Sequence, residues 1–544
     1  MEQSKNSYRT LGVMIDMSRN AVMSIDGLKR FLPLLQKMGY NCVMLYTEDT
    51  YEVNDEPYFG YMRGRYSKAE MKEIDALAAS LGMTVIPCIQ ALAHLSTIFR
   101  WKKFPHDCDD ILLTDDERTY TLIDNMLSTL SECFSSRKIH IGMDEANMLG
   151  RGRHLDRHGY ESVNTIMKRH LERICKLAEK YNYELMIWSD MYFRPWNNGE
   201  YVIPKQEIPR YIVESLPSSV TPVYWDYYQS KESVYSDMLE NHKQLSDKAW
   251  FAGGSWCWLG FIPFNRFTLK SMIPALSACK KHQVKDIIIT MWGDDGAECS
   301  HFSQLPSLFY LAEYANGNTD EATIKAKFKA FCGINFDEFM EIDCPNDVIE
   351  QDGMPCNPSK YMLYSDCFND YLDYTIQSGA RVKYKEYSQR LRSTAKKSRK
   401  YGYVFDTAAK LCDVLEIKYE LGLKTRLAYE SGNKNELKRL AENDYVEVRK
   451  RLNIFIKAFE KQWMMDNKPH GFDVQEMRLG ALLYRLGSCR RRILDYVNGK
   501  IDRIDELDEE LLAFRKKNTS FQFNQAPLTA TVNSIHHNHN SSVE

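Results

Sequence analysis

Eight short apolar runs alternate with longer amphipathic stretches between residue 8 and about residue 316, and this alternation constrains the fold most. The runs are rich in β-branched and aromatic residues, and the stretches between them repeat apolar residues at helical spacing. Eight such units predict a (β/α)8 TIM barrel, an α/β fold. A doubly wound open sheet is the alternative. The expected strands are residues 10–17, 41–48, 84–91, 138–145, 184–191, 221–228, 250–257 and 286–295.

Polar and aromatic side chains stand at the ends of nearly all these runs. In a TIM barrel the carboxyl ends of the strands share one face, where active sites are built. Tryptophan recurs there beside carboxylates, and it would expose a large apolar area unless a ligand covered it. The sequence therefore predicts a site with aromatic walls, drawn from Asp16, Glu48, Asp49, Gln90, Asp144, Glu145, Trp188, Asp190, Trp225, Asp226, Trp256, Trp292 and Asp294.

Two adjacent acids, Asp144 and Glu145, close the fourth run. Neighbouring residues of a strand point in different directions, so the two carboxylates are expected to have different surroundings. A glycosidase with a protein nucleophile needs two opposed carboxyl groups about 5 Å apart, on separate strands. An adjacent pair points instead to participation by an acetamido group of the substrate.

His140, Gly142, Asp144 and Glu145 form a His-x-Gly-x-Asp-Glu stretch that resembles the signature of glycoside hydrolase family 20, the β-N-acetylhexosaminidases. The resemblance covers roughly residues 8–300. It continues in order through residues 12–19, 45–49, 66–70, 87–94, Trp188, Trp225 and 292–294.

The resemblance implies an enzyme that removes terminal β-linked N-acetylglucosamine, N-acetylgalactosamine or both, with retention, through an oxazolinium intermediate. Glu145 would be the general acid and later the base that activates water. Asp144 would orient the acetamido group and stabilise the positive charge that forms on it. The resemblance implies the substrate-binding residues Arg19, Asp49, His94, His140, Trp188, Trp225, Tyr227, Trp256, Trp292 and Asp294.

Each of these assignments has an alternative. The tryptophans would enclose the sugar and its N-acetyl methyl group, but any one of them could be a core residue. Tyr228 is the alternative to Tyr227 as the hydrogen-bond partner of the acetamide. Asp295 and Glu298 are the alternatives to Asp294 as the partner of the O4 and O6 hydroxyls. His94 and His140 would support the acids or serve only the structure.

The chain departs from the family pattern at several points. Leu11 stands where an arginine usually precedes the first-strand glycine, so Arg19 is expected to take over the contacts to O3 and O4. Cys88 and Gln90 stand where the family often has acids. Because the first predicted strand begins at residue 10, we expect the family's usual N-terminal α+β domain to be absent, which would place the chain in a divergent intracellular branch.

The character of the sequence changes after Pro345, where charge-rich amphipathic stretches replace the strands. We expect a catalytic domain at residues 1–345, an α-helical domain at 346–517 and a polar, disordered tail at 518–544. The tail histidines His536, His537 and His539 fit solvated disorder better than a metal site.

Composition limits the partners and the compartment. Lysine plus arginine (71) nearly equals aspartate plus glutamate (74), which argues against nucleic acid and anionic membranes and favours a neutral ligand. We expect no leader or membrane span, since no apolar run follows a basic start and no apolar stretch is long enough to cross a bilayer. The 14 cysteines lack CxxC or zinc spacing, so we also expect a cytoplasmic protein with buried thiols. No cofactor or metal is expected, and a homodimer is left open.

Two other functions compete with this interpretation. A chitinase-type barrel would need an Asp-x-x-Asp-x-Asp-x-Glu run, which the sequence lacks. A sugar-binding barrel that has lost turnover, or another acetamido-dependent glycosidase, stays open. The sequence also leaves the choice between gluco- and galacto-configured sugars undetermined.

Overall fold

The computed structural model describes residues 8–294, 296–348, 355, 357–370 and 373–512. Packing divides the chain into two compact units. The barrel unit comprises Met1–Trp256, Phe267–Gly293 and Ser307–Ile324, and the helical unit comprises Cys257–Arg266, Asp294–Pro306 and Lys325–Glu544. Because these units interleave along the chain, the domain boundary at residue 345 stays a prediction.

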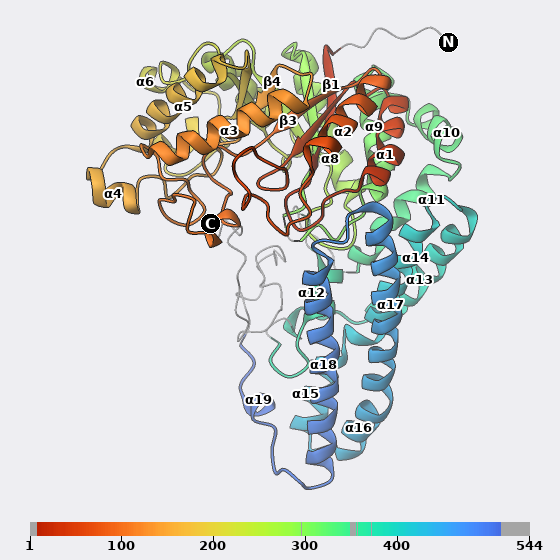
Figure 1. Cartoon of the computed structure of the whole chain (residues 1–544). Coiled ribbons are helices and arrows are strands. Elements are labelled where there is room, and N and C mark those ends of the chain that lie inside the picture. Colours follow the sequence, from red (N-terminus) through yellow and green to blue (C-terminus); the bar gives the residue numbers. More distant parts are fainter. Residues whose placement is uncertain (1–7, 295, 349–354, 356, 371–372, 513–544) are drawn as a thin grey trace. The chain divides into compact units, whose positions relative to one another are not determined.

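The barrel unit contains a closed barrel of eight parallel strands (Figure 1). Each strand pairs with the next, and β1 also pairs with β8, so that Gly12 lies between Cys42 and Ile288. The predicted (β/α)8 fold is confirmed, and the open doubly wound sheet is wrong. The strands are β1 (Thr10–Asp16), β2 (Cys42–Tyr46), β3 (Thr84–Cys88), β4 (Lys138–His140), β5 (Glu184–Trp188), β6 (Thr221–Trp225), β7 (Trp250–Gly254) and β8 (Asp286–Met291).

Helices follow the strands and cover the outside of the barrel, so nearly all strand residues are buried on both faces. Local signals set their starts: the Ser24 side chain accepts a hydrogen bond from Gly27 N, and Ser67 forms a capping box with Glu70. The helices are α1 (Ile25–Met38), α2 (Lys68–Ser80), α3 (Glu117–Cys133), α4 (Arg153–His158), α5 (Val163–Glu179), α6 (Arg210–Val213), α7 (Glu232–Leu245), α8 (Asn265–Lys281) and α9 (Leu305–Ala315).

The described residues of the C-terminal region form helices joined by turns and loops (Figure 1, green to blue), as predicted. Its helices are α10 (Glu321–Cys332), α11 (Phe336–Met340), α12 (Pro358–Tyr364), α13 (Ala380–Lys397), α14 (Gly402–Lys418), α15 (Leu421–Glu430), α16 (Lys434–Arg439), α17 (Tyr445–Asp466), α18 (Phe472–Val497) and α19 (Asp505–Asp508). The expected tail at 518–544 lies outside the described residues. No described helix combines the length and apolar character needed to cross a bilayer.

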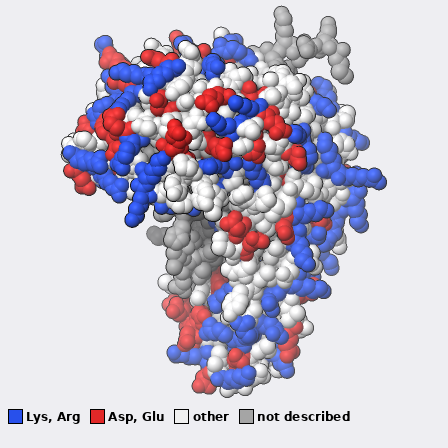
Figure 2. Space-filling model, viewed as in Figure 1, with Lys and Arg blue, Asp and Glu red and all other residues white. Residues whose placement is uncertain are grey.

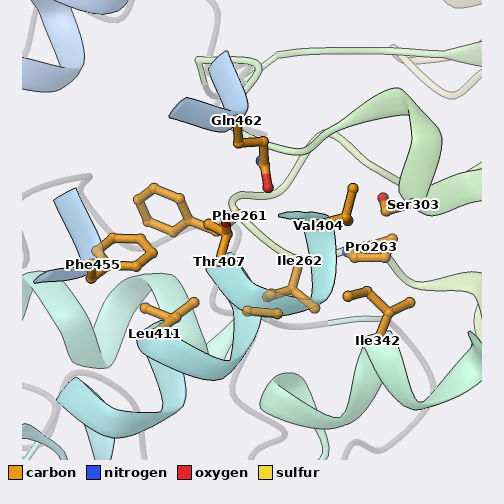
Figure 3. Close-up of a pocket in the computed structure, with 11 residues that line it drawn as sticks. Phe261, Ile262, Pro263, Ser303, Ile342, Val404, Thr407, Leu411, Phe455 and Gln462 are labelled. Carbon is orange, nitrogen blue, oxygen red and sulfur yellow. The ribbon is translucent and has the colours of Figure 1, made fainter. Parts of the chain in front are cut away.

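The helical unit holds a cavity of about 10 Å³, about the space of one water molecule. Figure 3 shows Val404, Thr407 and Leu411 of α14 on one wall, with Phe455 and Gln462 of α17 on another. No charged residue lines the cavity. It is therefore a small packing gap and offers no acid or base for catalysis.

The distribution of surface charge and the state of the cysteines agree with what the composition predicts. Figure 2 shows basic and acidic side chains interspersed over the visible face. The cysteines of the described residues form no disulfides, and most are buried.

Candidate active site

Asp144 and Glu145 lie beyond the end of β4, which stops at His140. Gly142, Met143 and Glu145 have φ values of 69°, 71° and 50°, all in the left-handed region. The expectation that strand alternation separates the two carboxylates is therefore wrong. Left-handed residues turn this loop sharply and give the two acids different surroundings.

The side-chain amide of Gln90 fixes this loop and Asp144. Its nitrogen donates to Asp144 Oδ1 (2.8 Å) and to the Tyr46 hydroxyl (3.0 Å), and its oxygen accepts from Met143 N (3.0 Å). Gly142 has a positive φ, and a Cβ atom there would lie 2.0 Å from that amide oxygen and 2.8 Å from the Ile89 carbonyl oxygen, so a side chain at this position would displace Gln90. An amide can donate to an ionised Asp144, which an ionised acid could not do.

His94 lies between the two catalytic candidates. Its Nε2 is 3.2 Å from Asp144 Oδ2 and 3.7 Å from Glu145 Oε2, and its backbone N donates to Asp110 Oδ2 (2.9 Å). Burial acts to lower the pKa of His94, but the negative charges of Asp144, Glu145 and Asp110 outweigh it and raise that pKa to about 10. His94 is therefore a cation at neutral pH.

The two acids respond to this environment in opposite directions. Burial acts to raise the pKa of Asp144, but the charge of His94 and the Gln90 hydrogen bond outweigh it and lower that pKa below its usual value. Burial raises the pKa of Glu145 and outweighs the opposing charge of His94, and the charge of Asp144 raises it further. Asp144 is thus held ionised, while Glu145 is favoured as a proton donor.

Asp190 and Arg194 form the next layer around Glu145. Asp190 Oδ2 accepts from Glu145 N (2.9 Å) and so holds the backbone of the acid. Burial, and then the charges of Asp144 and Glu145, raises the pKa of Asp190 to about 7. Arg194 Nη2 is 3.7 Å from Glu145 Oε1. The strand-end pattern identifies Asp190, but no sequence signal identifies Arg194.

Arg19 lies among buried acids and aromatic rings. Its Nη1 donates to Asp16 Oδ2 (2.7 Å), and its Nε is 3.0 Å from Glu48 Oε1. Its guanidinium lies 5.1 Å from the Tyr46 ring centroid and 5.4 Å from that of Trp292. Burial, partly opposed by Arg19, raises the pKa of Glu48 to about 7.

Asp49 pairs with a residue that the sequence does not single out. Arg63 Nε is 3.2 Å from Asp49 Oδ1, and Arg63 also donates to the Ser18 carbonyl. These contacts join the loop after β2 to the loop after β1. The site therefore contains a second guanidinium besides that of Arg19, namely that of Arg63, which lies beside the predicted sugar-binding residue Asp49.

His140 packs against Trp188 with ring centroids 4.2 Å apart, and Trp188 lies 6.0 Å from Trp292. Burial lowers the pKa of His140 to about 3, so this residue is neutral. Its Nδ1 accepts from Gly142 N (3.1 Å). These contacts place His140 in support of the loop that carries the acids.

The remaining predicted aromatic residues form a second group. Trp225 and Tyr227 stack with centroids 5.5 Å apart, and Trp256 Nε1 donates to the Tyr227 carbonyl (2.9 Å). Tyr228, the alternative to Tyr227, is 37% exposed, whereas Tyr227 is buried. Asp294 follows β8 and belongs to the helical unit, so its assignment to the sugar stays a prediction.

Two sets of described residues bring metal-ligand atoms within 4.8 Å of one another: His94, Asp144 and Glu145, and Asp115, His154 and Glu161. In the first set, His94 already pairs with both acids. In the second, Arg169 already bonds to both Asp115 and Glu161. In the described structure the ligand atoms of both sets are thus engaged in ion pairs within the chain.

Two family models match the chain. Residues 7–215 match the glycosyl hydrolase family 20 catalytic domain, and residues 335–524 match the glycoside hydrolase 20C C-terminal domain. Together the two matches span most of the chain.

Similar proteins include Hexosaminidase D of Bos taurus, 25% identical over 347 residues, or 57% of this chain and 92% of the bovine protein. Hexosaminidase D of Homo sapiens is 25% identical over 38% of this chain and 43% of that protein. An exo-β-N-acetylglucosaminidase of Vibrio harveyi, solved with N-acetylglucosamine, has a TM-score of 0.47 and 15% identity over 60% of this chain and 58% of its own.

Proposed function

Because the chain belongs to glycoside hydrolase family 20, the family of the β-N-acetylhexosaminidases, we propose that it removes terminal N-acetylhexosamine residues with retention. The nucleophile would be the carbonyl oxygen of the substrate's own acetamido group. The relatives named Hexosaminidase D support the choice of substrate class. A cytoplasmic location is part of the proposal, since buried free thiols suit a reducing compartment.

The observation that carries the proposal is the unequal surroundings of two neighbouring acids. Asp144 accepts from Gln90 (2.8 Å) and lies 3.2 Å from His94, whereas Glu145 lies 3.7 Å from His94 and 3.7 Å from Arg194. Glu145, with its raised pKa, donates a proton to the glycosidic oxygen as the bond to the anomeric carbon breaks. The acetamido oxygen attacks that carbon at the same time, and the ring that forms carries a positive charge. Asp144, with its lowered pKa, is ionised and stabilises this charge.

In the second half of the reaction Glu145, now ionised, takes a proton from water. The water oxygen attacks the anomeric carbon, and the bond to the acetamido oxygen breaks. The sugar leaves with its original configuration, and Glu145 holds the proton again. His94 remains protonated throughout, because its pKa of about 10 lies well above neutral pH.

The tryptophans around the acids, such as Trp188 beside His140 and Trp292, are proposed to form a pocket that admits only one terminal sugar, so that cleavage is exo. Arg19 and Asp49 are proposed to bind its hydroxyls. The choice between N-acetylglucosamine and N-acetylgalactosamine depends on the partner of O4 and is left to experiment.

The test is hydrolysis of p-nitrophenyl β-N-acetylglucosaminide and its galactosaminide counterpart, with the first-formed anomer read by proton NMR. We expect the β-anomer first, tight inhibition by the thiazoline analogue of the intermediate, and very poor turnover of the matching 2-hydroxyl glucoside. A covalent adduct with a 2-fluoro glycoside, without thiazoline inhibition, would contradict the mechanism. Thiazoline binding without any p-nitrophenol release would instead support a sugar-binding barrel that has lost turnover.

A further inference from the structure

Three aromatic side chains form an exposed cluster on the loops that follow β2 and β3. Tyr58 is 47% exposed and Tyr61 is 43% exposed, and Trp101 is partly exposed. The Trp101 ring lies 5.2 Å from the Tyr58 ring and 5.7 Å from the Tyr61 ring, centroid to centroid. Contiguous exposed apolar surface of this kind marks binding sites more often than chance placement.

Buried contacts beneath the cluster hold the two loops together. Phe59 of the first loop packs edge-on against Phe104 of the second, with centroids 6.2 Å apart, and both rings are buried. Lys103 pairs with Glu56 and donates to the Asp55 carbonyl (3.1 Å). The two loops that carry the exposed rings are therefore held against each other without a ligand, which reduces the entropy cost of binding.

The first loop is joined directly to the candidate active site. Arg63, two positions after Tyr61, pairs with Asp49 (3.2 Å). Gly60 has a φ of 63°, and a Cβ atom there would lie 1.9 Å from the Asp49 carbonyl oxygen. The backbone between Tyr58 and Tyr61 thus packs against the residue predicted to bind the terminal sugar.

The second loop is joined to the site through His94, which contacts both acids. A series of turns connects His94 to Trp101: Ile98 N donates to the Leu95 carbonyl, and Trp101 N donates to the Ile98 carbonyl (3.0 Å each). Both loops leave the carboxyl ends of their strands, so the cluster lies on the catalytic face of the barrel.

We propose that Tyr58, Tyr61 and Trp101 form a platform that binds the sugar next to the scissile bond, on the leaving-group side. A pyranose ring has an apolar C–H face that suits an aromatic surface, while its hydroxyl groups stay in water. An exo-acting pocket accepts only the terminal sugar, so further sugars extend on the leaving-group side alone. The proposal rests on the proposed function and makes oligosaccharides of two or more sugars the preferred substrates.

The test compares kcat/KM for N,N′-diacetylchitobiose with that for methyl β-N-acetylglucosaminide, whose leaving group has no ring. Trp101→Ala and the double variant Tyr58→Ala/Tyr61→Ala are expected to lower kcat/KM for the disaccharide about tenfold, and for the methyl glycoside less than about twofold. Trp101→Phe keeps a ring and should retain most of the activity. Tyr211→Ala is the matched control, since Tyr211 is 57% exposed and lies on α6, outside these loops.

An equal loss on both substrates, or no loss on either, would overturn the platform. A second measurement separates this outcome from failure of the proposed function. Calorimetry measures the binding of chitotetraose to the Glu145→Gln variant and to the double variant Glu145→Gln/Trp101→Ala. If the wild-type protein hydrolyses no N-acetylhexosaminide but binding still weakens about tenfold, the platform stands and the proposed function fails. If hydrolysis occurs and binding is independent of Trp101, the platform fails alone.

Discussion

The barrel unit and the helical unit both bury charged side chains, but the bonding partners of these charges differ between the two units. In the helical unit, Lys418 Nζ donates to the Ser365 carbonyl (2.6 Å) and hydroxyl (2.9 Å), and Arg485 makes two bonds to Asp366 (2.6 and 2.8 Å). Arg426 donates to four backbone carbonyls, those of Phe368, Glu506, Leu507 and Glu509. These charges hold segments of the unit together.

At the mouth of the barrel, the buried acids outnumber the nearby cations. Asp144, Glu145 and Asp190 share His94 and Arg194, and their pKa values shift in different directions. The comparison teaches that burial of charge does not by itself mark a catalytic site. At the barrel mouth the unequal proton affinities belong to adjacent acids at the carboxyl end of a strand, where a TIM barrel builds its active site.

The largest effect is expected from Glu145→Gln, which removes the proton donor. kcat/KM for a disaccharide should fall about 100- to 10,000-fold, while thiazoline binding persists because the pocket keeps its shape. The loss should be smaller for a dinitrophenyl glycoside, whose leaving group needs no proton. Glu184→Gln, on the surface at the start of β5, is the control. Near-normal turnover of the disaccharide would show that Glu145 is not the acid.

Asp144→Asn is expected to lower kcat about 100- to 1,000-fold, because the charge that stabilises the cyclic intermediate is lost. Thiazoline should bind more weakly as well, which distinguishes this variant from Glu145→Gln. Inhibition constants for thiazoline measured on both variants provide the check. Unchanged thiazoline affinity in Asp144→Asn would contradict the assigned role.

Lys418→Met tests the helical side of the comparison. Removal of the Lys418 ammonium group leaves the buried Ser365 carbonyl without this donor, so the free energy of unfolding should fall by about 2 kcal/mol. Turnover by the folded protein should stay within about twofold of the wild-type value. Urea unfolding and kcat at 20 °C measure the two effects. Lys424→Met, which breaks a partly exposed pair with Glu420, is the control. A loss of kcat without a loss of stability would mean that this charge serves catalysis.

The smallest effect is expected from Arg194→Gln, read in the pH profile of kcat/KM. Activity requires protonated Glu145 and is lost as the pH rises through the pKa of Glu145. The charge of Arg194 lowers that pKa, so its removal should move the alkaline limb to higher pH, by less than about one unit. Arg210→Gln, with a side chain that is 90% exposed, should leave the limb in place. Movement to lower pH would contradict the electrostatic account.

The eight strands, the helical C-terminal region and the prominence of Asp144 and Glu145 could all be predicted from the sequence. Strand and helix patterns are local: apolar runs such as residues 286–291 read as strands without knowledge of their neighbours. A motif such as residues 140–145 is local as well. The predicted strands ran too far at their carboxyl ends, and strand 4 most of all, because the left-handed turns at Gly142 and Met143 end the pairing early.

Only the tertiary structure decided which residues surround the acids. Gln90 reaches Asp144 across 54 positions of sequence, Arg63 reaches Asp49 from the far end of its loop, and Arg194 approaches Glu145 from the connection after β5. The pKa shifts arise from these distances and from burial, which depend on how the barrel closes. Sequence therefore determined which acids are adjacent, and folding decided which of them holds the proton, because electrostatic energy depends on separation in space and not along the chain.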